Sequence, residues 1–295
     1  MALNGCATTA TPAPVVAAVP AAPVGVPPGM QFLYGSGEAA ALSYQAYQAL
    51  AATIIARAAD RRLGRPVPSV VLAAGATLEA PVFAPCGDRP LAVVFDVDET
   101  ALLNLGFEAS EAQRAGPYDQ SRWERWERTG AAAVIATPGM AEVARAARDA
   151  GVTMVFNTNR MAANAAQTEL ALTGAGLGPV AHGRNLWLQG DAGPGSGKDA
   201  RRWAIAALYC VVAMAGDQLG DFSDLFNAGN PPPAIRRALT ASGGVRSLWG
   251  SGWFILPNPV YGTGLKGSLD QVFPADRRWT DPGPDPAPAP KPAAP

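Results

Sequence analysis

The first clear pattern in the chain is helical. Between residues 38 and 63, apolar side chains recur every four residues, at Leu42, Ala46, Leu50 and Ile54. That spacing places them on one face of a helix. Ser36 stands where an N-cap is expected, and Gly64 with Pro66 would end the segment. The pattern predicts one long amphipathic helix over residues 38–63.

Further along, short apolar runs alternate with helical patterns. Runs typical of buried strands cover residues 91–95, 152–156, 185–188 and 210–215. Helical patterns lie between them and cover residues 140–150, 163–173 and 199–208. Apolar strands that alternate with helices favour a parallel sheet with helices on both faces. We therefore expect an α/β fold, in which ligands bind beyond the carboxyl ends of the strands.

Composition sets the two ends of the chain apart. Residues 7–28 are almost entirely Ala, Pro, Thr, Val and Gly, and residues 282–295 are mostly Pro and Ala. Segments of this kind bury too little side chain to offset the entropy of ordering them. We predict a signal remnant with a disordered tether over residues 1–29, a folded domain over 30–280 and a disordered tail over 281–295.

The charge balance narrows the class of partner. Charged residues make up 16% of the chain, and the formal net charge is −1. A nucleic acid polymer needs clustered positive charge on its partner, so we do not expect one here. No apolar run free of Pro and charge reaches the roughly 18 residues that a membrane-spanning helix needs, so none is expected.

Polar residues follow three of the predicted strands: Asp96 and Asp98, then Thr158, then Asp217 and Asp221. Lys198 opens the helix before the last of these strands. A turn with capping residues explains one such aspartate comfortably, because Asp is common where strands end. It does not explain acid, hydroxyl and acid at three strand ends that meet at one edge of a sheet, with a lysine nearby.

These residue types fit a site of phosphoryl transfer. A carboxylate can act as nucleophile and form an aspartyl-phosphate, and we assign this role to Asp96. Asp98 is suited to give a proton to the leaving oxygen and then to activate water. Thr158 and Lys198 would hold the phosphate oxygens. Neighbouring carboxylates need a cation, and Mg²⁺ suits an all-oxygen site that Asp217 would complete.

The same residues resemble a known family. Asp96–Thr100, Thr158, Lys198 and Gly216–Asp221 resemble the phosphatase branch of the haloacid dehalogenase (HAD) superfamily. The chain is more closely similar to the bacterial class C acid phosphatases, which are outer-membrane lipoproteins that also act as 5′-nucleotidases. That similarity spans about residues 30–265 and rests on Tyr44–Tyr47, Asp98–Thr100 with Asn104, Phe156–Arg160, Gly216–Phe222 and Leu256–Gly262.

The resemblance implies a Rossmann-like core with a small, mainly helical cap, which we place at about residues 30–64 and 101–138. It implies that Mg²⁺ is bound by Asp96, the Asp98 carbonyl and Asp217, with Asp221 supporting the site. It also implies hydrolysis of nucleoside monophosphates and aromatic phosphates, often by a homodimer. The chain departs from the family pattern at Leu103, where an acidic residue is common, and in the Gly- and Pro-rich loop before Lys198.

Cysteine positions bear on the location of the protein. Leu3-Asn4-Gly5-Cys6 resembles a bacterial lipobox, where a signal is cut and the Cys is lipidated. A charged region and an apolar region should precede it, whereas only Met1-Ala2 stand there, so either the signal is trimmed or the match is chance. We therefore expect an enzyme anchored through Cys6 in the cell envelope, at the outer membrane. In an oxidising compartment Cys86 and Cys210 could pair, but they fit equally well as two small core residues.

Several side chains are candidates for the substrate rim. Tyr118, Trp123 and Trp126 lie where the cap is expected, and stacking of a base on an aromatic ring is worth roughly 1–3 kcal/mol. The two tryptophans, three positions apart, could equally pack a cap helix. Tyr261 and Asn159, which lie in family-like segments, are the other candidates.

Two other functions compete with phosphoryl transfer from a bound ester. The stretch Gly193–Lys198 resembles a P-loop, but Asp199 follows the lysine where that motif needs Ser or Thr. The alternative function is a surface lipoprotein that binds a haem-like ligand. His182 is the only histidine and is expected on a loop, so few axial ligands are on offer.

Overall fold

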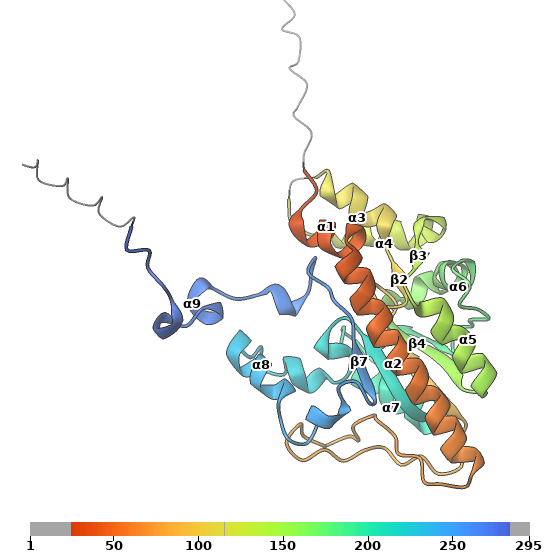
Figure 1. Ribbon diagram of the computed structural model, residues 1–295. Coiled ribbons are helices and arrows are strands. Elements are labelled where there is room, and N and C mark those ends of the chain that lie inside the picture. The colour runs from red at the N-terminus through yellow and green to blue at the C-terminus, as the bar shows by residue number, and fades with distance from the viewer. Residues whose placement is uncertain (1–24, 115, 284–295) are drawn as a thin grey trace, which may run out of the picture.

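A five-stranded parallel sheet lies at the centre of the molecule (Figure 1). The computed structural model describes residues 25–114 and 116–283. The strands lie in the order β5-β4-β1-β6-β7, and every neighbouring pair is parallel. The middle strand, β1 (Leu91–Phe95), is buried along its whole length. The predicted α/β fold with a parallel sheet is confirmed.

The other strands are β4 (Thr153–Met161), β5 (Leu186–Gln189), β6 (Cys210–Gly216) and β7 (Trp253–Ile255). β4 continues beyond the predicted end at residue 156, because its polar half still pairs with β5 across an irregular register. Thr158 therefore lies within the strand and not after it. β7 was not predicted, since three residues are too few to show a period.

Three helices cover one face of the sheet: α2 (Gly37–Arg62), α5 (Met140–Ala150) and α6 (Ala165–Gly174). In Figure 1 α2 lies across the sheet. Its buried side chains share one apolar core with Val93 and Phe95 of β1. On α2 the predicted apolar face is right at Leu50 and Ile54 but wrong at Leu42, which is exposed. Tyr47 is buried instead, because its hydroxyl donates to the Thr100 carbonyl at 2.7 Å.

The position of α2 corrects the expected extent of the cap. Residues 30–64 were expected to belong to the cap, but α2 packs on the sheet and on α5 as a layer of the core. The physical reason is its apolar face, which is long enough to cover the sheet. The short helix α1 (Pro28–Gly35) precedes it and packs against α2 and α3. Helix α1 begins at Pro28, within residues 1–29 that were expected to form the tether.

The opposite face of the sheet is covered by α7 (Asp199–Leu208) and by a cluster of aromatic rings. Ala92 and Val94 of β1 point to this side, so alternate residues of the strand enter different cores. The aromatic cluster comprises Phe222, Phe226, Trp249 and Trp253, whose rings meet at centroid distances of 5.1–6.1 Å. Both faces are thus closed, as a parallel sheet requires.

The insert between β1 and α5 forms the cap. It contains α3 (Leu105–Ala112), α4 (Gln120–Thr129) and the antiparallel pair β2 (Leu102–Leu103) and β3 (Ile135–Ala136). In Figure 1 these elements lie together near the N-terminal end of α2. This insert is small and mainly helical.

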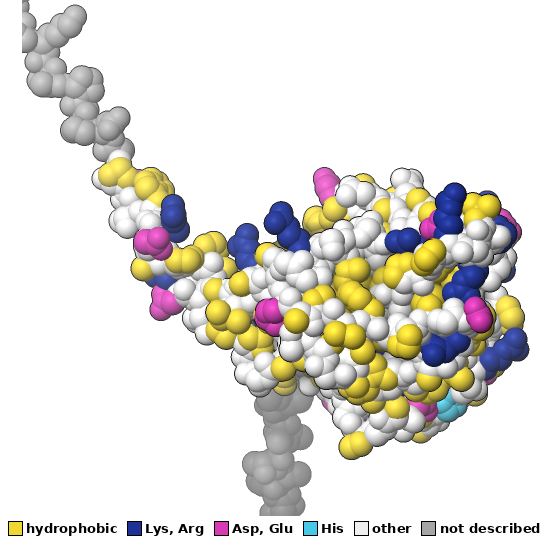
Figure 2. Space-filling model, turned by 90° about the horizontal axis from the view of Figure 1, so that it is seen from below, with side chains coloured by type: hydrophobic (Ala, Val, Ile, Leu, Met, Phe, Trp, Pro, Cys, Tyr) yellow, Lys and Arg dark blue, Asp and Glu magenta, His cyan; other side chains and the backbone are white. Residues whose placement is uncertain are grey.

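The C-terminal part carries two more helices, α8 (Pro233–Thr240) and α9 (Leu269–Val272). Figure 2 shows the C-terminal segment standing off the body of the molecule. Within the described ranges, no helix combines the length and apolarity that crossing a membrane requires. The lipobox-like residues 3–6 and most of the predicted tether and tail lie outside the described residues.

A disulfide joins Cys86 to Cys210, which are 124 residues apart in sequence. Cys86 lies in the segment between α2 and β1, and Cys210 is the first residue of β6. Of the two possibilities left open by the sequence, the structure shows the pair. It ties an irregular segment to the end of a core strand.

Candidate active site

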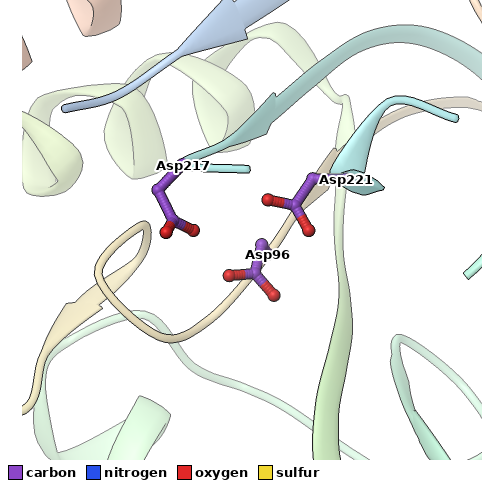
Figure 3. A group of neighbouring side chains, drawn as sticks. All are labelled: Asp96, Asp217 and Asp221. Atoms are coloured by element: carbon purple, nitrogen blue, oxygen red, sulfur yellow. The ribbon is translucent and has the colours of Figure 1, made fainter. Parts of the chain in front are cut away.

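Three aspartates meet beyond the carboxyl ends of β1 and β6. Asp96 follows β1, and its amide donates to the Ala215 carbonyl of β6 at 3.0 Å. One carboxylate oxygen from each of Asp96, Asp217 and Asp221 lies within 4.8 Å of the others. Figure 3 shows the three side chains pointing toward one another, and all three are buried. The predicted convergence of these residues is therefore present.

Close backbone approach holds Asp221 in this group. Asp221 ends a short 3₁₀ helix (Leu219–Asp221) that follows β6. Its Oδ2 accepts from the Gln218 backbone amide at 2.8 Å. A Cβ added to Gly216 would lie only 2.2 Å from the Cβ of Asp221. Glycine is therefore required at position 216 if the chain is to fold back and place Asp221 over Asp96.

Lys198 is the cation of the cluster. Its Nζ donates to Asp96 and also to Asp221, the latter at 2.7 Å, and the residue is buried. Lys198 stands at the N-terminus of α7, where its own amide and that of Asp199 both donate to the Asp224 carboxylate at 2.9 Å. Because a carboxylate of the chain occupies these helix amides, the P-loop interpretation is wrong for this loop.

Charge in the cluster is out of balance. One ammonium group faces three buried carboxylates, and burial raises the pKa of Asp96 well above its usual value despite Lys198. Burial, and then Asp221, raise the pKa of Asp217 to about 7. For Lys198 burial lowers the pKa, but Asp221 and Asp96 outweigh it and the pKa is raised. A buried group of this charge fits a divalent cation, which is the usual partner of clustered carboxylate oxygens.

Three neutral donors orient Asp217. Its Oδ1 accepts from the Thr100 hydroxyl at 3.1 Å, and its Oδ2 accepts from Asn258 at 2.7 Å and from Gln218 at 2.9 Å. Positioning donors of this kind fix a ligand's direction. The sequence gives no reason to expect Asn258 at this site apart from its place in a family-like segment, because a lone Asn far along the chain has no distinguishing pattern.

Asp98 lies apart from the three-carboxylate group. Its Oδ1 accepts from Arg160 at 2.8 and 2.9 Å, and its Oδ2 lies 3.5 Å from the Thr158 hydroxyl. Thr158 is fully buried and its hydroxyl also accepts from the Arg160 amide at 3.1 Å. Of the residues predicted to do chemistry, Asp98 and Thr158 thus lie together as one pair, and Asp96 and Lys198 as another.

The predicted substrate residues have differing surroundings. Tyr261 is 37% exposed, and its hydroxyl donates to the buried Glu99. Trp123 is half-buried and packs edge-on against Phe107, with ring centroids 4.9 Å apart, which is the packing role that the sequence left open. Asn159 is exposed and accepts a hydrogen bond from Arg201. Tyr118 is 60% exposed.

Arg160 and Asn104 contact Asp98 but were given no role on sequence grounds. Both occur in the segments that carry the family resemblance. A buried arginine looks like any other arginine in a sequence, and the run around it gives no sign of which carboxylate it meets.

Comparison with known proteins agrees with this geometry. A family model described as "HAD superfamily, subfamily IIIB (Acid phosphatase)" matches residues 42–264. No match was found among curated proteins.

Two solved structures share the fold. A class C acid phosphatase from Bacillus anthracis is 24% identical, with a TM-score of 0.61, over 80% of this chain and 84% of that one. A structure titled as that phosphatase with tungstate bound gives 22% identity and a TM-score of 0.60, over 83% and 92% of the two chains. We conclude that the chain belongs to subfamily IIIB of the HAD superfamily, the acid phosphatases, and is a phosphomonoesterase.

Proposed function

We propose that the protein is a Mg²⁺-dependent acid phosphatase that forms an aspartyl-phosphate on Asp96. The observation that carries the proposal is the contact of Lys198 with both Asp96 and Asp221, inside a buried group of three carboxylates. Lys198 neutralises part of the charge where a phosphate must enter, and it holds Asp96 in place. A purely structural role would not account for so much unbalanced buried charge.

In the first step, an Asp96 carboxylate oxygen attacks phosphorus and the bond from phosphorus to the ester oxygen breaks. Asp98 gives its proton to the departing oxygen, which leaves as an alcohol. In the second step, Asp98 takes a proton from water, the resulting hydroxide attacks phosphorus, and the bond to Asp96 breaks. Inorganic phosphate is released, and the Asp96 carboxylate is restored.

Donors on two elements would hold the phosphate group. Lys198 stands at the start of α7, and Thr158 lies in β4 beside Asp98. Asp96, Asp217 and the carbonyl of Asp98 would hold Mg²⁺, with Asp221 supporting the site. When bound, the ion supplies charge for the phosphate oxygens in the transition state.

For substrates we infer small phosphate monoesters with aromatic or nucleoside leaving groups. Tyr261 and Tyr118 support this inference, since both residues are exposed to solvent. The solved structure with tungstate, an oxyanion of phosphate-like shape, supports an oxyanion site in the family. A panel of AMP, GMP, nicotinamide mononucleotide and phosphotyrosine, assayed with Mg²⁺, would rank the leaving groups.

We infer further that the enzyme works in a bacterial cell envelope, anchored through Cys6. The disulfide between Cys86 and Cys210 supports an oxidising compartment. Labelling with a radioactive fatty acid in a bacterial host should mark the wild-type chain, and the label should be lost in Cys6→Ser. Label retained in that variant would refute the anchor.

The central test replaces the nucleophile. Asp96→Asn should lower turnover of p-nitrophenyl phosphate by more than about 10³-fold, because the amide cannot form the acyl phosphate. The melting temperature should stay the same or rise, since a buried carboxylate is removed from a crowded group. Asp60→Asn, on the outer part of α2, is the matched control and should keep full activity. Unchanged turnover in Asp96→Asn would refute the mechanism.

No contact in the described ranges favours the haem-binding alternative. Cys86 and Cys210 are paired with each other, and Nε2 of His182 bonds to Asp191 at 2.8 Å. A haem titration of the wild type and of His182→Ala should show no difference in the Soret band. A band that depends on His182 would revive that function.

A further inference from the structure

Asn104, which has no role in the proposed two-step reaction, lies at the centre of a buried hydrogen-bond network around Asp98. It is fully buried in the cap, between β2 and α3. Its side-chain nitrogen donates to Asp98 Oδ1 at 2.9 Å. Its side-chain oxygen accepts from Arg160 at 2.9 Å and from the Trp126 indole at 3.2 Å. Its backbone N–H donates to the Glu99 carboxylate at 2.9 Å.

The network treats the two oxygens of Asp98 differently. Oδ1 accepts three hydrogen bonds, one from Asn104 and two from Arg160, all between 2.8 and 2.9 Å. Among the described residues, Oδ2 accepts one hydrogen bond, from the Thr158 hydroxyl at 3.5 Å. A carboxylate held in this way cannot rotate, and Oδ2, with its single long hydrogen bond, is the oxygen that can exchange a proton.

The cap takes part through Trp126 of α4. Its ring is seated tightly, because a Cβ added to Gly130 would lie 2.1 Å from it. The neighbouring Trp123 lies beneath the Arg160 guanidinium, which is 5.9 Å from its ring centroid. The two tryptophans of the cap thus contact the two donors that hold Asp98, and the aromatic residues left open by the sequence gain a specific role.

We propose that Asn104 is a positioning residue for proton transfer, which locks Asp98 through Arg160 and ties its orientation to the cap through Trp126. The proposal rests on the proposed role of Asp98 as acid and base. It implies that the cap does more than shape the pocket: the acid is aligned only while α4 is in place.

A leaving-group comparison tests this directly. The value of kcat/KM reports the steps up to transfer of the phosphoryl group to Asp96. Ethanol must receive a proton to leave, whereas p-nitrophenolate leaves without one. Asn104→Ala should therefore lower kcat/KM for ethyl phosphate by about 100-fold. For p-nitrophenyl phosphate the loss should be no more than about 5-fold.

Asn185→Ala is the matched control. Asn185 also makes three side-chain hydrogen bonds, but at the opposite edge of the sheet, just before β5. It should leave the ratio of the two kcat/KM values unchanged. An equal loss on both substrates in Asn104→Ala would mean general disruption of the site and would overturn the proposal. If the wild type were inactive on both substrates, that result would instead refute the proposed function.

A milder variant covers the case in which Asn104→Ala does not fold. Trp126→Phe keeps an aromatic ring against Gly130 but removes the donor to Asn104. It should lower kcat/KM for ethyl phosphate by roughly 3- to 10-fold, with less than a 2-fold change for p-nitrophenyl phosphate. Trp203→Phe loses a similar indole bond, 2.9 Å to Leu72 on the far side of α7, and should change neither. In an Asp98→Asn background, Trp126→Phe should have no further effect; an undiminished effect there would overturn the proposal.

Discussion

At the scale of single residues, three acidic groups near the site have raised pKa values. Burial raises the pKa of Asp217 and of Glu108 to about 7 and that of Glu99 to about 8. In an unfolded chain such groups titrate near pH 4. The folded, metal-free protein therefore keeps protons that the unfolded chain has already lost between about pH 4 and 8. Its stability falls as the pH rises through that window.

This balance predicts a pH-dependent stabilisation by metal. A cation bound at Asp96 and Asp217 requires their ionised forms and offsets their mutual repulsion. The increase in melting temperature on changing from EDTA to Mg²⁺ should therefore grow from pH 5 to pH 8, by on the order of 5 °C. Thermal scans at four pH values would measure it. Asp217→Asn should remove most of the increase, and an equal increase at pH 5 and pH 8 would contradict this account.

At the scale of elements, α7 shows how a helix end serves the site. Asp224 accepts from the amides of Lys198 and Asp199, and it also pairs with Arg202. Asp224→Ala should cost about 1–2 kcal/mol of unfolding free energy. It should also lower kcat by roughly 10-fold or more, because Lys198 moves with the first turn of the helix. Urea unfolding and steady-state assays would measure the two effects.

A second cap in the same molecule provides the control for that prediction. Ser36 caps α2 through its hydroxyl, which accepts from the Ala39 amide at 3.1 Å, and it takes no part in the site. Ser36→Ala should cost about 1 kcal/mol and leave kcat unchanged. Equal losses of activity in Ser36→Ala and Asp224→Ala would show that only stability matters.

At the scale of the whole molecule, the disulfide closes a loop of 124 residues that contains β1, β4 and the cap. Restricting the unfolded chain over so long a loop stabilises the fold by about 2–4 kcal/mol. Cys86→Ser with Cys210→Ser should lower unfolding free energy by that amount in urea. Reducing agent should have the same effect on the wild type and none on the double variant. A wild type insensitive to reduction under unfolding conditions would contradict the prediction.

Catalysis should depend little on that link, because Cys210 begins β6 and the acidic group lies at its other end. The double variant is expected to keep kcat within about 2-fold at a temperature where it stays folded, since residues far from the chemistry usually act through stability alone. Measuring kcat and the unfolding free energy of the double variant would show that the disulfide contributes to stability and not to catalysis.

Much of this fold was predictable because its central elements are locally distinctive. β1 and α5 match their predicted bounds, since a fully buried strand and an amphipathic helix each show their period within a few residues. The acidic residues of the site were predictable for a related reason. In a parallel sheet the carboxyl ends of all strands lie at the same edge. Residues near those ends, such as Asp96, Thr158 and Asp217, are therefore expected to lie close together.

Tertiary structure decided which of those residues touch. Lys198 and Asp96 are 102 positions apart, and Arg160 and Asp98 are 62 apart. Spacing in a sequence carries no information on contacts of that kind, because they depend on how separate elements pack. The same holds for the Cys86–Cys210 pair, for the face of α2 that lies on the sheet, and for Asn104 between the cap and Asp98. The sequence by itself determined the class of fold and the kind of chemistry; packing alone determined which partners hold the reacting groups.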